Sequence, residues 1–356
     1  MAGRLISRQQ IQWTRLTPRP DPQHGSPCAR SSHGLSIVQK GTRLILLGGE
    51  HVARTPLSRE YWAADWTDDG QWQWRLLTTT TTDDSQLPPD RIAHAQAAIE
   101  DQVYVFGGRA GITMQEMAMN DLWKLDCSGP PGTEAWSPVT AQGSAPDARS
   151  FHRMIAIGKS LYVFGGCGVQ GRLADLYRFD VETSTWHALG ASPLLRGRGG
   201  PNLLSLNGGT RIGVVAGFCG EETADGHVFT LENGQWDDQL LHLQDMRPRS
   251  VCVSGSFPSL GYSVIFGGEV DPSDRGHEGA GGFEQDLVVL DETNASFLAS
   301  FPPEDASAWP PARGWSDAAT LEEESGRGKL FVFGGLAGDD ENPKRLDDLW
   351  MLEIQK

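Results

Sequence analysis

Carboxylate and imidazole side chains are concentrated in the segment 269–278 of this chain. The residues are Glu269, Asp271, Asp274, His277 and Glu278, within the sequence FGGEVDPSDRGHEGAGG. Carboxylate oxygens and imidazole nitrogens are ligands for hard or borderline cations such as Fe(II), Mn(II) and Zn(II). Asp-Pro and Ser-Asp also favour Asx-type turns, which would give the same residues a role in shaping a loop. The sequence therefore leaves two alternatives open, a metal site and a structural loop.

A second group with chemical potential is a set of arginines that recurs along the chain. Each opens an Arg-x-x-His motif or a variant of it, in the order RSSH, RIAH, RSFH, RGGP, RSVC and RGWS. The arginines are Arg30, Arg91, Arg149, Arg198, Arg249 and Arg313. A guanidinium group binds carboxylate, sulfate or phosphate through forked hydrogen bonds. In the alternative interpretation, each arginine bonds to carbonyl or carboxylate groups and holds neighbouring repeats together.

The elements that must position these residues are repeated units. Residues 161–186, LYVFGGCGVQGRLADLYRFDVETSTW, contain an apolar run, a diglycine, a polar loop, an alternating run and a closing tryptophan. Glycines without a Cβ allow the strand to end in a tight turn. The diglycine, or its variant VVAGF, recurs roughly every 50 to 70 residues, at Gly48, Gly107, Gly165, Gly217, Gly267 and Gly334.

These repeats predict an all-β fold, a six-bladed β-propeller with four strands per blade. The strands would be the Arg-x-x-His strand, the diglycine strand, a DLW-type strand and a tryptophan strand. The prediction is a single domain over residues 1–356, with the inner strands starting near residues 30, 91, 149, 198, 249 and 313.

Closure of the ring is predicted from the tryptophans. Trp74, Trp136, Trp186 and Trp236 close the first four copies, and Phe297 takes this place in the fifth. The sixth copy ends without such a residue, whereas Trp13 precedes the first copy. We therefore expect residues 11–16 to form the outer strand of the last blade, which removes its free edge.

Several short motifs add to the repeat pattern: ARSSHG (29–34), ARSFH (148–152), RGRGG (196–200), FGGEVDPSDRGH (266–277) and ARGW (312–315). With them, the chain resembles the kelch family of β-propellers over essentially its whole length. Within that family it is similar to the plant nitrile-specifier and epithiospecifier proteins. The resemblance implies a small-molecule enzyme of specialised metabolism with lyase or rearrangement chemistry and Fe(II) as cofactor. No nucleotide cofactor is expected, because the glycine-rich segment RGRGGP (196–201) lacks the lysine and the following helix of a phosphate-binding loop.

The resemblance also implies a set of metal ligands. In the specifier proteins the iron ligands follow a Glu-x-x-x-Asp-x-x-x-His pattern. Glu269 and His277 occupy the first and last places of that pattern here, whereas Ser273 occupies the middle place. Asp274 lies one residue later and Asp271 two residues earlier, so the expected ligands are Glu269, Asp274 and His277, with Asp271 as the alternate.

Strand order predicts which residues share a face. If the arginine strand is innermost, the six arginines lie at the same mouth of the channel as the loops after the diglycines. Those loops are 109–119, 218–226, 269–284 and 336–346. This mouth is the expected site of an anionic ligand, with Trp309 and Trp315 as an aromatic wall or, alternatively, as core residues. Cys252 is expected to be a buried inert thiol, and no catalytic nucleophile is predicted.

Composition limits the classes of partner. The formal charge of −16 disfavours nucleic acid and anionic membranes, which require clustered Lys and Arg. No run is apolar enough for a secretory signal or a membrane span, and five scattered cysteines are typical of reduced thiols, so a cytoplasmic protein is expected. The expected partner is an anionic small molecule; the alternative is a non-catalytic interaction module that presents its loop face to another protein.

Overall fold

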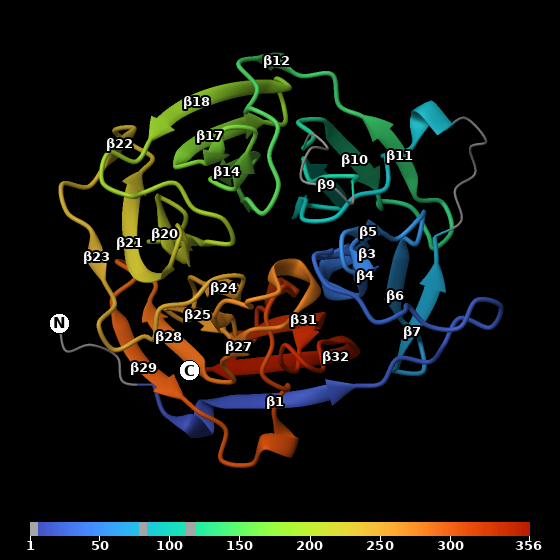
Figure 1. Cartoon of the computed structure of the whole chain (residues 1–356). Coiled ribbons are helices and arrows are strands. Elements are labelled where there is room, and N and C mark those ends of the chain that lie inside the picture. Colours follow the sequence, from blue (N-terminus) through green and yellow to red (C-terminus); the bar gives the residue numbers. More distant parts are fainter. Residues whose placement is uncertain (1–5, 78–83, 112–117) are drawn as a thin grey trace.

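Six β-sheets surround a central axis in the computed structural model, which describes residues 6–77, 84–111 and 118–356 (Figure 1). Each sheet is one blade, and its main strands run antiparallel from the axis outward. The predicted six-bladed propeller is confirmed. Among the described residues no helix is both long and apolar enough to cross a membrane.

Each blade holds four or five strands, ordered from the axis outward. Blade 1 is β2 (Gly34–Val38), β3 (Arg43–Leu47), β6 (Trp62–Trp66) and β7 (Trp72–Leu76); blade 2 is β8 (Ala95–Ile99), β9 (Gln102–Phe106), β10 (Leu122–Asp126) and β11 (Ala135–Pro138). Blade 3 is β13 (Arg153–Ile157), β14 (Ser160–Phe164), β17 (Asp175–Asp180), β18 (Thr185–Ala191) and β12 (Gln142–Gly143); blade 4 is β19 (Asn202–Leu206), β20 (Arg211–Phe218), β21 (Glu222–Thr230), β22 (Gln235–Trp236) and β23 (Leu241–His242). Blade 5 is β24 (Val253–Phe257), β25 (Tyr262–Phe266), β28 (Leu287–Asp291) and β29 (Phe297–Phe301); blade 6 is β30 (Asp317–Glu322), β31 (Arg327–Ala337), β32 (Lys344–Gln355) and β1 (Ile11–Leu16).

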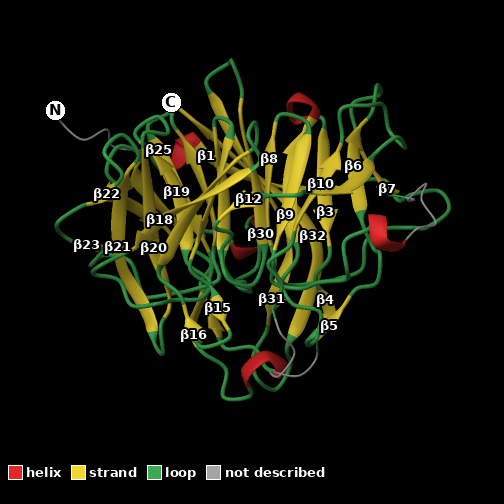
Figure 2. Ribbon diagram, turned by 90° about the horizontal axis from the view of Figure 1, so that it is seen from above, coloured by secondary structure: helices red, strands yellow, loops and turns green. Residues whose placement is uncertain are grey.

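Short hairpins extend from three blades on one face of the ring, toward the bottom of Figure 2. They are β4 (Glu50–Val52) with β5 (Thr55–Pro56), β15 (Cys167–Gly168) with β16 (Gly171–Arg172), and β26 (Glu269–Asp271) with β27 (Gly282–Phe283). The remaining elements are 3-10 turns: η1 (Arg8–Gln10), η2 (Gln39–Gly41), η3 (Asp84–Gln86), η4 (Gly276–Glu278) and η5 (Ala306–Ala308). Two segments expected as loops, 218–226 and 336–346, are partly strand, because β20–β21 and β31–β32 continue pairing past the glycines.

The N-terminal strand closes the ring as predicted. β1 pairs antiparallel with β32, with Trp13 opposite Leu352, and lies beside it in Figure 1. Trp13 packs among core residues of blades 5 and 6, 4.9 Å from the ring of Phe266 between centroids. The two ends of the chain are therefore joined in one blade.

Apolar side chains on both faces of each diglycine strand form the core between blades. In β3, Leu44 and Leu46 pack toward blade 6, whereas Ile45 and Leu47 pack toward blade 2. A strand that is covered on both faces requires a continuous apolar run rather than alternation. This requirement explains the uninterrupted apolar runs that precede the diglycines.

The diglycines also connect neighbouring blades through their backbone. The second glycine of each copy donates its N–H to the carbonyl of the repeat arginine in the next blade, as from Gly49 to Arg91 at 3.1 Å and from Gly335 to Arg30 at 2.8 Å. Gly48 has a φ of +61°, and a Cβ there would lie 2.7 Å from the carbonyl oxygen of Arg91. Only glycine allows this approach and this conformation.

Three histidines of the repeat motif are buried between blades and serve as a pH-sensitive part of the core. The ring of His94 packs against Gly48 of the neighbouring blade, so closely that a Cβ on this glycine would lie 2.9 Å from the ring. His152 and His33 pack in the same way against glycines of their neighbouring blades. Burial lowers the pKa of His94 to about 3 and lowers the pKa values of His33 and His152 well below the usual range. All three are therefore neutral in the folded protein.

Acid is expected to destabilise the propeller through these histidines. Between pH 6.5 and the folded pKa, the unfolded chain binds protons that the folded chain excludes, so stability decreases as the pH falls. At pH 5 the cost is about 2 kcal/mol per histidine. Urea unfolding of the wild type and of His94→Gln at pH 7 and pH 5 measures the effect of one site: the variant should lose about 2 kcal/mol less over this interval. If the wild type and His94→Gln lost the same free energy of unfolding between pH 7 and pH 5, His94 would not be neutral in the folded protein.

Candidate functional site

One mouth of the channel is lined by the same position of all six blades, the residue directly after the diglycine or its variant. These residues are Glu50, Arg109, Cys167, Phe218, Glu269 and Leu336. Each forms a backbone bridge to the residue after the repeat arginine, as between Glu50 and Ser31. The bridge fixes the start of each loop beside the axis. We call the cavity that these residues surround the diglycine mouth.

The diglycine mouth has the volume and lining of a ligand pocket. Its volume is about 340 Å³, within the range of about 300–1,000 Å³ typical of such pockets. Its cationic side chains are Arg54, Arg109, Arg172 and Arg345. Its aromatic side chains are Phe151, Phe218 and Trp315. The cavity therefore combines positive charge with apolar surface.

Ring stacking and hydrogen bonds hold these side chains in place. The guanidinium of Arg172 lies 4.5 Å from the ring centre of Phe218, and that of Arg109 lies 5.9 Å from Phe151. The ring of Phe151 meets Trp315 edge-on at 5.4 Å. Such cation–π contacts hold the two guanidinium groups flat against aromatic rings beside the cavity.

A closed ring of backbone hydrogen bonds forms the floor of the diglycine mouth. The position two residues after each repeat arginine has a positive φ in all six blades, between 48° and 59°. Each of these residues donates its N–H to the carbonyl of the equivalent residue in the preceding blade, at 2.8–3.0 Å. The residues are Ser32, Ala93, Phe151, Gly200, Val251 and Trp315. This constriction places Phe151 and Trp315 at the base of the mouth.

The six repeat arginines lie behind the wall of this mouth rather than in it. All six are 3 % exposed or less, and none lines the cavity. Arg149 shows the shared pattern: its guanidinium donates to both carboxylate oxygens of Asp175, at 2.7 and 3.0 Å, and to the carbonyl of Gly165 at 3.0 Å. The geometry thus corrects the expected ligand role, because the donors of each arginine are taken up within its own blade. The carboxylates are Glu60, Asp121, Asp175, Asp225, Asp286 and Asp348.

The two tryptophans predicted as an aromatic wall lie in different places. Trp315 lines the diglycine mouth and belongs to its floor. Trp309 is instead buried against Trp13 of the closing strand, with ring centres 6.1 Å apart. The expectation for Trp309 at the mouth is therefore corrected: the proline-rich segment before Arg313 carries it outward to cover β1.

Positive charge predominates in the diglycine mouth. Glu50 accepts hydrogen bonds from Ser31 and Ser32 and lies 3.6 Å from the guanidinium of Arg345. Burial raises the pKa of Glu269 to about 7 and that of Glu222, behind Ser250, to about 8. Near neutral pH neither of these two carboxyl groups carries a full negative charge. The four guanidinium groups consequently outnumber the carboxylates, although the whole chain is acidic.

The expected metal ligands do not converge among the described side chains, and no cluster of three or more potential ligands occurs there. Glu269 faces the mouth, Asp271 is exposed and forms an ion pair with Arg247 at 2.9 Å, and Asp274 is exposed. The side chain of His277 lies outside the described residues. These positions fit a loop shaped by polar contacts, so we derive no catalytic step through a metal. Cys252 is buried, and burial raises the pKa of its thiol to about 11.

Iron binding remains a prediction from the resemblance and has a direct test. If the acidic loop binds Fe(II), protein purified anaerobically should contain it, and His277→Ala should lose most of it, because a three-ligand site rarely tolerates loss of one. Elemental analysis measures the content. Glu278→Ala is the control on the same turn. Equal iron content in wild type and His277→Ala would remove His277 from any ligand set.

Sequence reasoning missed the arginines that line the mouth. Arg109 directly follows a diglycine, and that position could have been selected because it recurs in all six copies. Arg54, Arg172 and Arg345 have no common offset from the repeat motif. They line the cavity from the hairpins β4–β5, β15–β16 and β31–β32.

Comparison with known proteins agrees with this architecture. The six similar blades define the chain as a repeat-built β-propeller. It belongs to the kelch-repeat family, since the family model described as KLHDC2/KLHL20/DRC7 Kelch-repeats domain matches residues 84–268, more than half of the chain.

Individual relatives are distant. The chain is 25 % identical over 353 residues to N-(sulfonatooxy)prop-2-enimidothioate sulfolyase of Thlaspi arvense, covering 92 % of this chain and 93 % of that protein. It is 23 % identical over 353 residues to the dynein alpha chain of the flagellar outer arm of Chlamydomonas reinhardtii and 26 % identical over 230 residues to host cell factor 1 of Rattus norvegicus. The aligned regions are 94 % and 62 % of this chain but only 7 % and 11 % of those two proteins.

A solved structure supports the fold alone. The structure of YjhT superposes with a TM-score of 0.64 at 17 % sequence identity, covering 93 % of this chain and 98 % of that chain.

Proposed function

We propose that the diglycine mouth binds an organic anion with an apolar body and promotes a lyase or rearrangement reaction on it. The observation that supports this proposal is the lining of the cavity, which combines four guanidinium groups with three aromatic side chains. An anionic group would accept hydrogen bonds from the arginines, while its apolar part would pack on Phe151, Phe218 and Trp315.

The substrate class we favour carries a sulfate-like group. The relative from Thlaspi arvense is named a sulfolyase with a sulfonatooxy substrate, and its similarity extends over nearly the full length of both chains. When a carbon–oxygen or nitrogen–oxygen bond to sulfate breaks, negative charge accumulates on the departing sulfate. Preorganised guanidinium groups would stabilise that charge, an effect that usually dominates such catalysis. The low-dielectric walls of the channel strengthen it further.

A protein-binding role is the second candidate, and a separate observation favours it. Val52 and Val169 are 62 % and 76 % exposed, at the tips of the hairpins β4–β5 and β15–β16 on the rim of the mouth. Exposed apolar side chains on a rim are common in interaction surfaces. The double variant Val52→Ser, Val169→Ser should lower the affinity for a protein partner and leave the affinity for a small anion unchanged.

Arg172→Ala is expected to weaken binding of a small aryl sulfate such as phenyl sulfate. Loss of a hydrogen bond to a charged group costs about 1.5–3 kcal/mol, which is roughly a tenfold to hundredfold increase in Kd. Isothermal titration calorimetry at fixed ionic strength measures the change. The melting temperature should stay close to that of the wild type, because Arg172 is exposed.

The matched control is Arg196→Ala. Arg196 is also exposed and pairs with Glu221 on the same face, but it does not line the cavity. Its loss should leave phenyl sulfate affinity unchanged. Equal weakening in both variants would indicate only a general effect of charge, and no saturable binding by the wild type would reject the anion site and favour the protein-binding role.

A further inference from the structure

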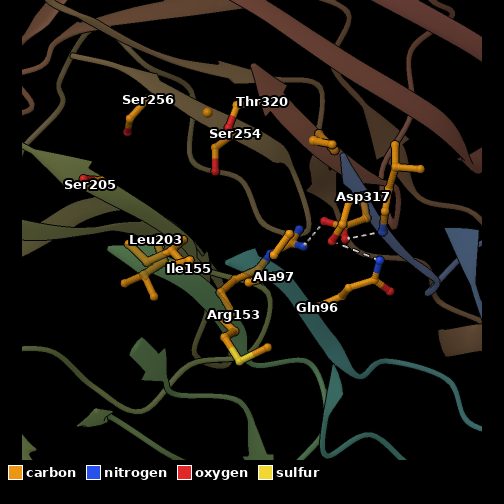
Figure 3. Close-up of a pocket in the computed structure, with 18 of the residues that line it drawn as sticks. Gln96, Ala97, Arg153, Ile155, Leu203, Ser205, Ser254, Ser256, Asp317 and Thr320 are labelled. Atoms are coloured by element: carbon orange, nitrogen blue, oxygen red, sulfur yellow. Dashed lines mark hydrogen bonds and ion pairs between the residues drawn. The ribbon is translucent and has the colours of Figure 1, made fainter. Parts of the chain in front are cut away.

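A second cavity opens on the opposite side of the backbone hydrogen-bond ring (Figure 3). Its volume is about 350 Å³, comparable with that of the diglycine mouth. The innermost strands of all six blades line it: β2, β8, β13, β19, β24 and β30. The walls of this cavity are therefore regular β-strands rather than loops. We call it the opposite mouth.

An ion pair across the channel forms the floor of the opposite mouth. Arg153 of blade 3 reaches Asp317 of blade 6, with 3.2 Å between Nη1 and Oδ1, and Figure 3 shows the two side chains facing each other. Arg153 also donates to the carbonyls of Pro201 and Cys252, and Asp317 accepts from the backbone N–H of Leu35 at 2.8 Å. The pair therefore ties five blades together and separates the two mouths. Each side chain remains partly exposed, 23 % for Arg153 and 17 % for Asp317.

Five hydroxyl groups line the walls of this cavity. They come from four blades: Ser36, Ser205, Ser254, Ser256 and Thr320. Figure 3 places Ser205, Ser254, Ser256 and Thr320 around the cavity on the side away from Asp317. Small side chains such as Ala97 and Ala318 also line the cavity. A hydroxyl group both donates and accepts hydrogen bonds, so these walls can bind donor groups and acceptor groups of a ligand.

The charge balance selects a neutral ligand. The floor holds one cation and one anion that compensate each other, and Arg153 and Asp317 are the charged residues that line this cavity. A charged ligand would be desolvated here without a counter-charge, which is strongly unfavourable. A ligand hydroxyl, in contrast, can donate to Asp317 and accept from Arg153 or a serine. We propose that the opposite mouth binds a neutral polyhydroxylated molecule, a sugar or polyol, independently of the anion site.

The proposal can be tested with D-glucose and myo-inositol as neutral probes. Ligand-observed NMR on the full chain should give saturable binding of at least one of them at millimolar concentrations. Gluconate and glucosamine, which keep most of the hydroxyl groups but add a negative or positive charge, should bind at least tenfold more weakly than glucose. Equal binding of the charged analogues would overturn the neutral assignment.

Variants locate the site. Ser254→Leu and, as a second choice, Ser205→Leu place apolar bulk in the cavity and should abolish binding of the neutral probes while phenyl sulfate binding persists. Arg172→Ala should instead weaken phenyl sulfate binding and leave binding of the neutral probes unchanged. The proposal is overturned if neither neutral probe shows saturable binding to the wild type, or if their binding survives in both leucine variants while the melting temperature is unchanged.

Discussion

Arg313→Ala is expected to lower the free energy of unfolding by about 3–5 kcal/mol, the usual cost of removing one partner of a buried ion pair. Arg313 is 1 % exposed and donates to both oxygens of Asp348, at 2.7 and 2.8 Å, and to the carbonyl of Gly334 at 2.8 Å. The variant leaves a carboxylate that is itself only 9 % exposed without a counter-charge. The loss of stability should therefore be the same with and without a ligand.

Urea unfolding followed by tryptophan fluorescence measures this loss. Arg172→Ala, in the mouth, is the matched arginine control and should change the free energy of unfolding by less than about 0.5 kcal/mol. Where Arg313→Ala remains folded, its affinity for phenyl sulfate should equal that of the wild type. If Arg313→Ala had normal stability and weakened anion binding, the result would instead support a ligand-binding role for the repeat arginines.

The repeat architecture could be predicted because its signals recur in the same order along the chain, although the spacing between copies varies. The diglycine and the closing tryptophan recur in register, and Trp13 was the only tryptophan at the place needed to complete the sixth copy, so both the blade number and the closure followed. A partner for four of the six arginines was also present in the pattern, as the aspartate that opens a DLW-type run at Asp121, Asp175, Asp286 and Asp348. Its separation from the arginine varies between 26 and 37 residues, so spacing alone did not assign the pairs.

The lining of the two mouths could not be predicted in the same way. Arg54, Arg172 and Arg345 depend on how individual hairpins bend, which no repeated spacing records. The cross-channel pair of Arg153 and Asp317 joins residues of opposite blades, and only the closed ring brings them together. Periodic features therefore define the scaffold here, whereas the chemistry lies in residues that depart from the repeat.

Deleting residues 1–16 is expected to have the largest effect on stability, because it removes β1 and reopens the ring. Trp13 is 8 % exposed in the cluster between blades 5 and 6, and Ile6 and Ile11 pack with it. Loss of a buried tryptophan side chain alone costs about 3–5 kcal/mol, and each buried isoleucine adds about 1.5–3 kcal/mol. The deletion should therefore cost more than about 5 kcal/mol. It would also expose the outer edge of β32 over residues 349–354, which β1 covers, and an uncovered strand edge favours self-association.

Calorimetric melting and analytical ultracentrifugation of the truncated protein test both consequences, with two point variants to separate side-chain packing from strand pairing. Trp13→Ala should reproduce the packing loss without association, because the backbone bonds of β1 to β32 remain. Gln12→Ala, on the exposed face of the same strand, should have no measurable effect. A synthetic peptide of residues 6–16 should restore the melting temperature of the truncated protein in a concentration-dependent manner, since it supplies the missing strand in trans. Unchanged melting after the deletion would mean that β1 contributes little to closure and that blades 5 and 6 hold the ring together on their own.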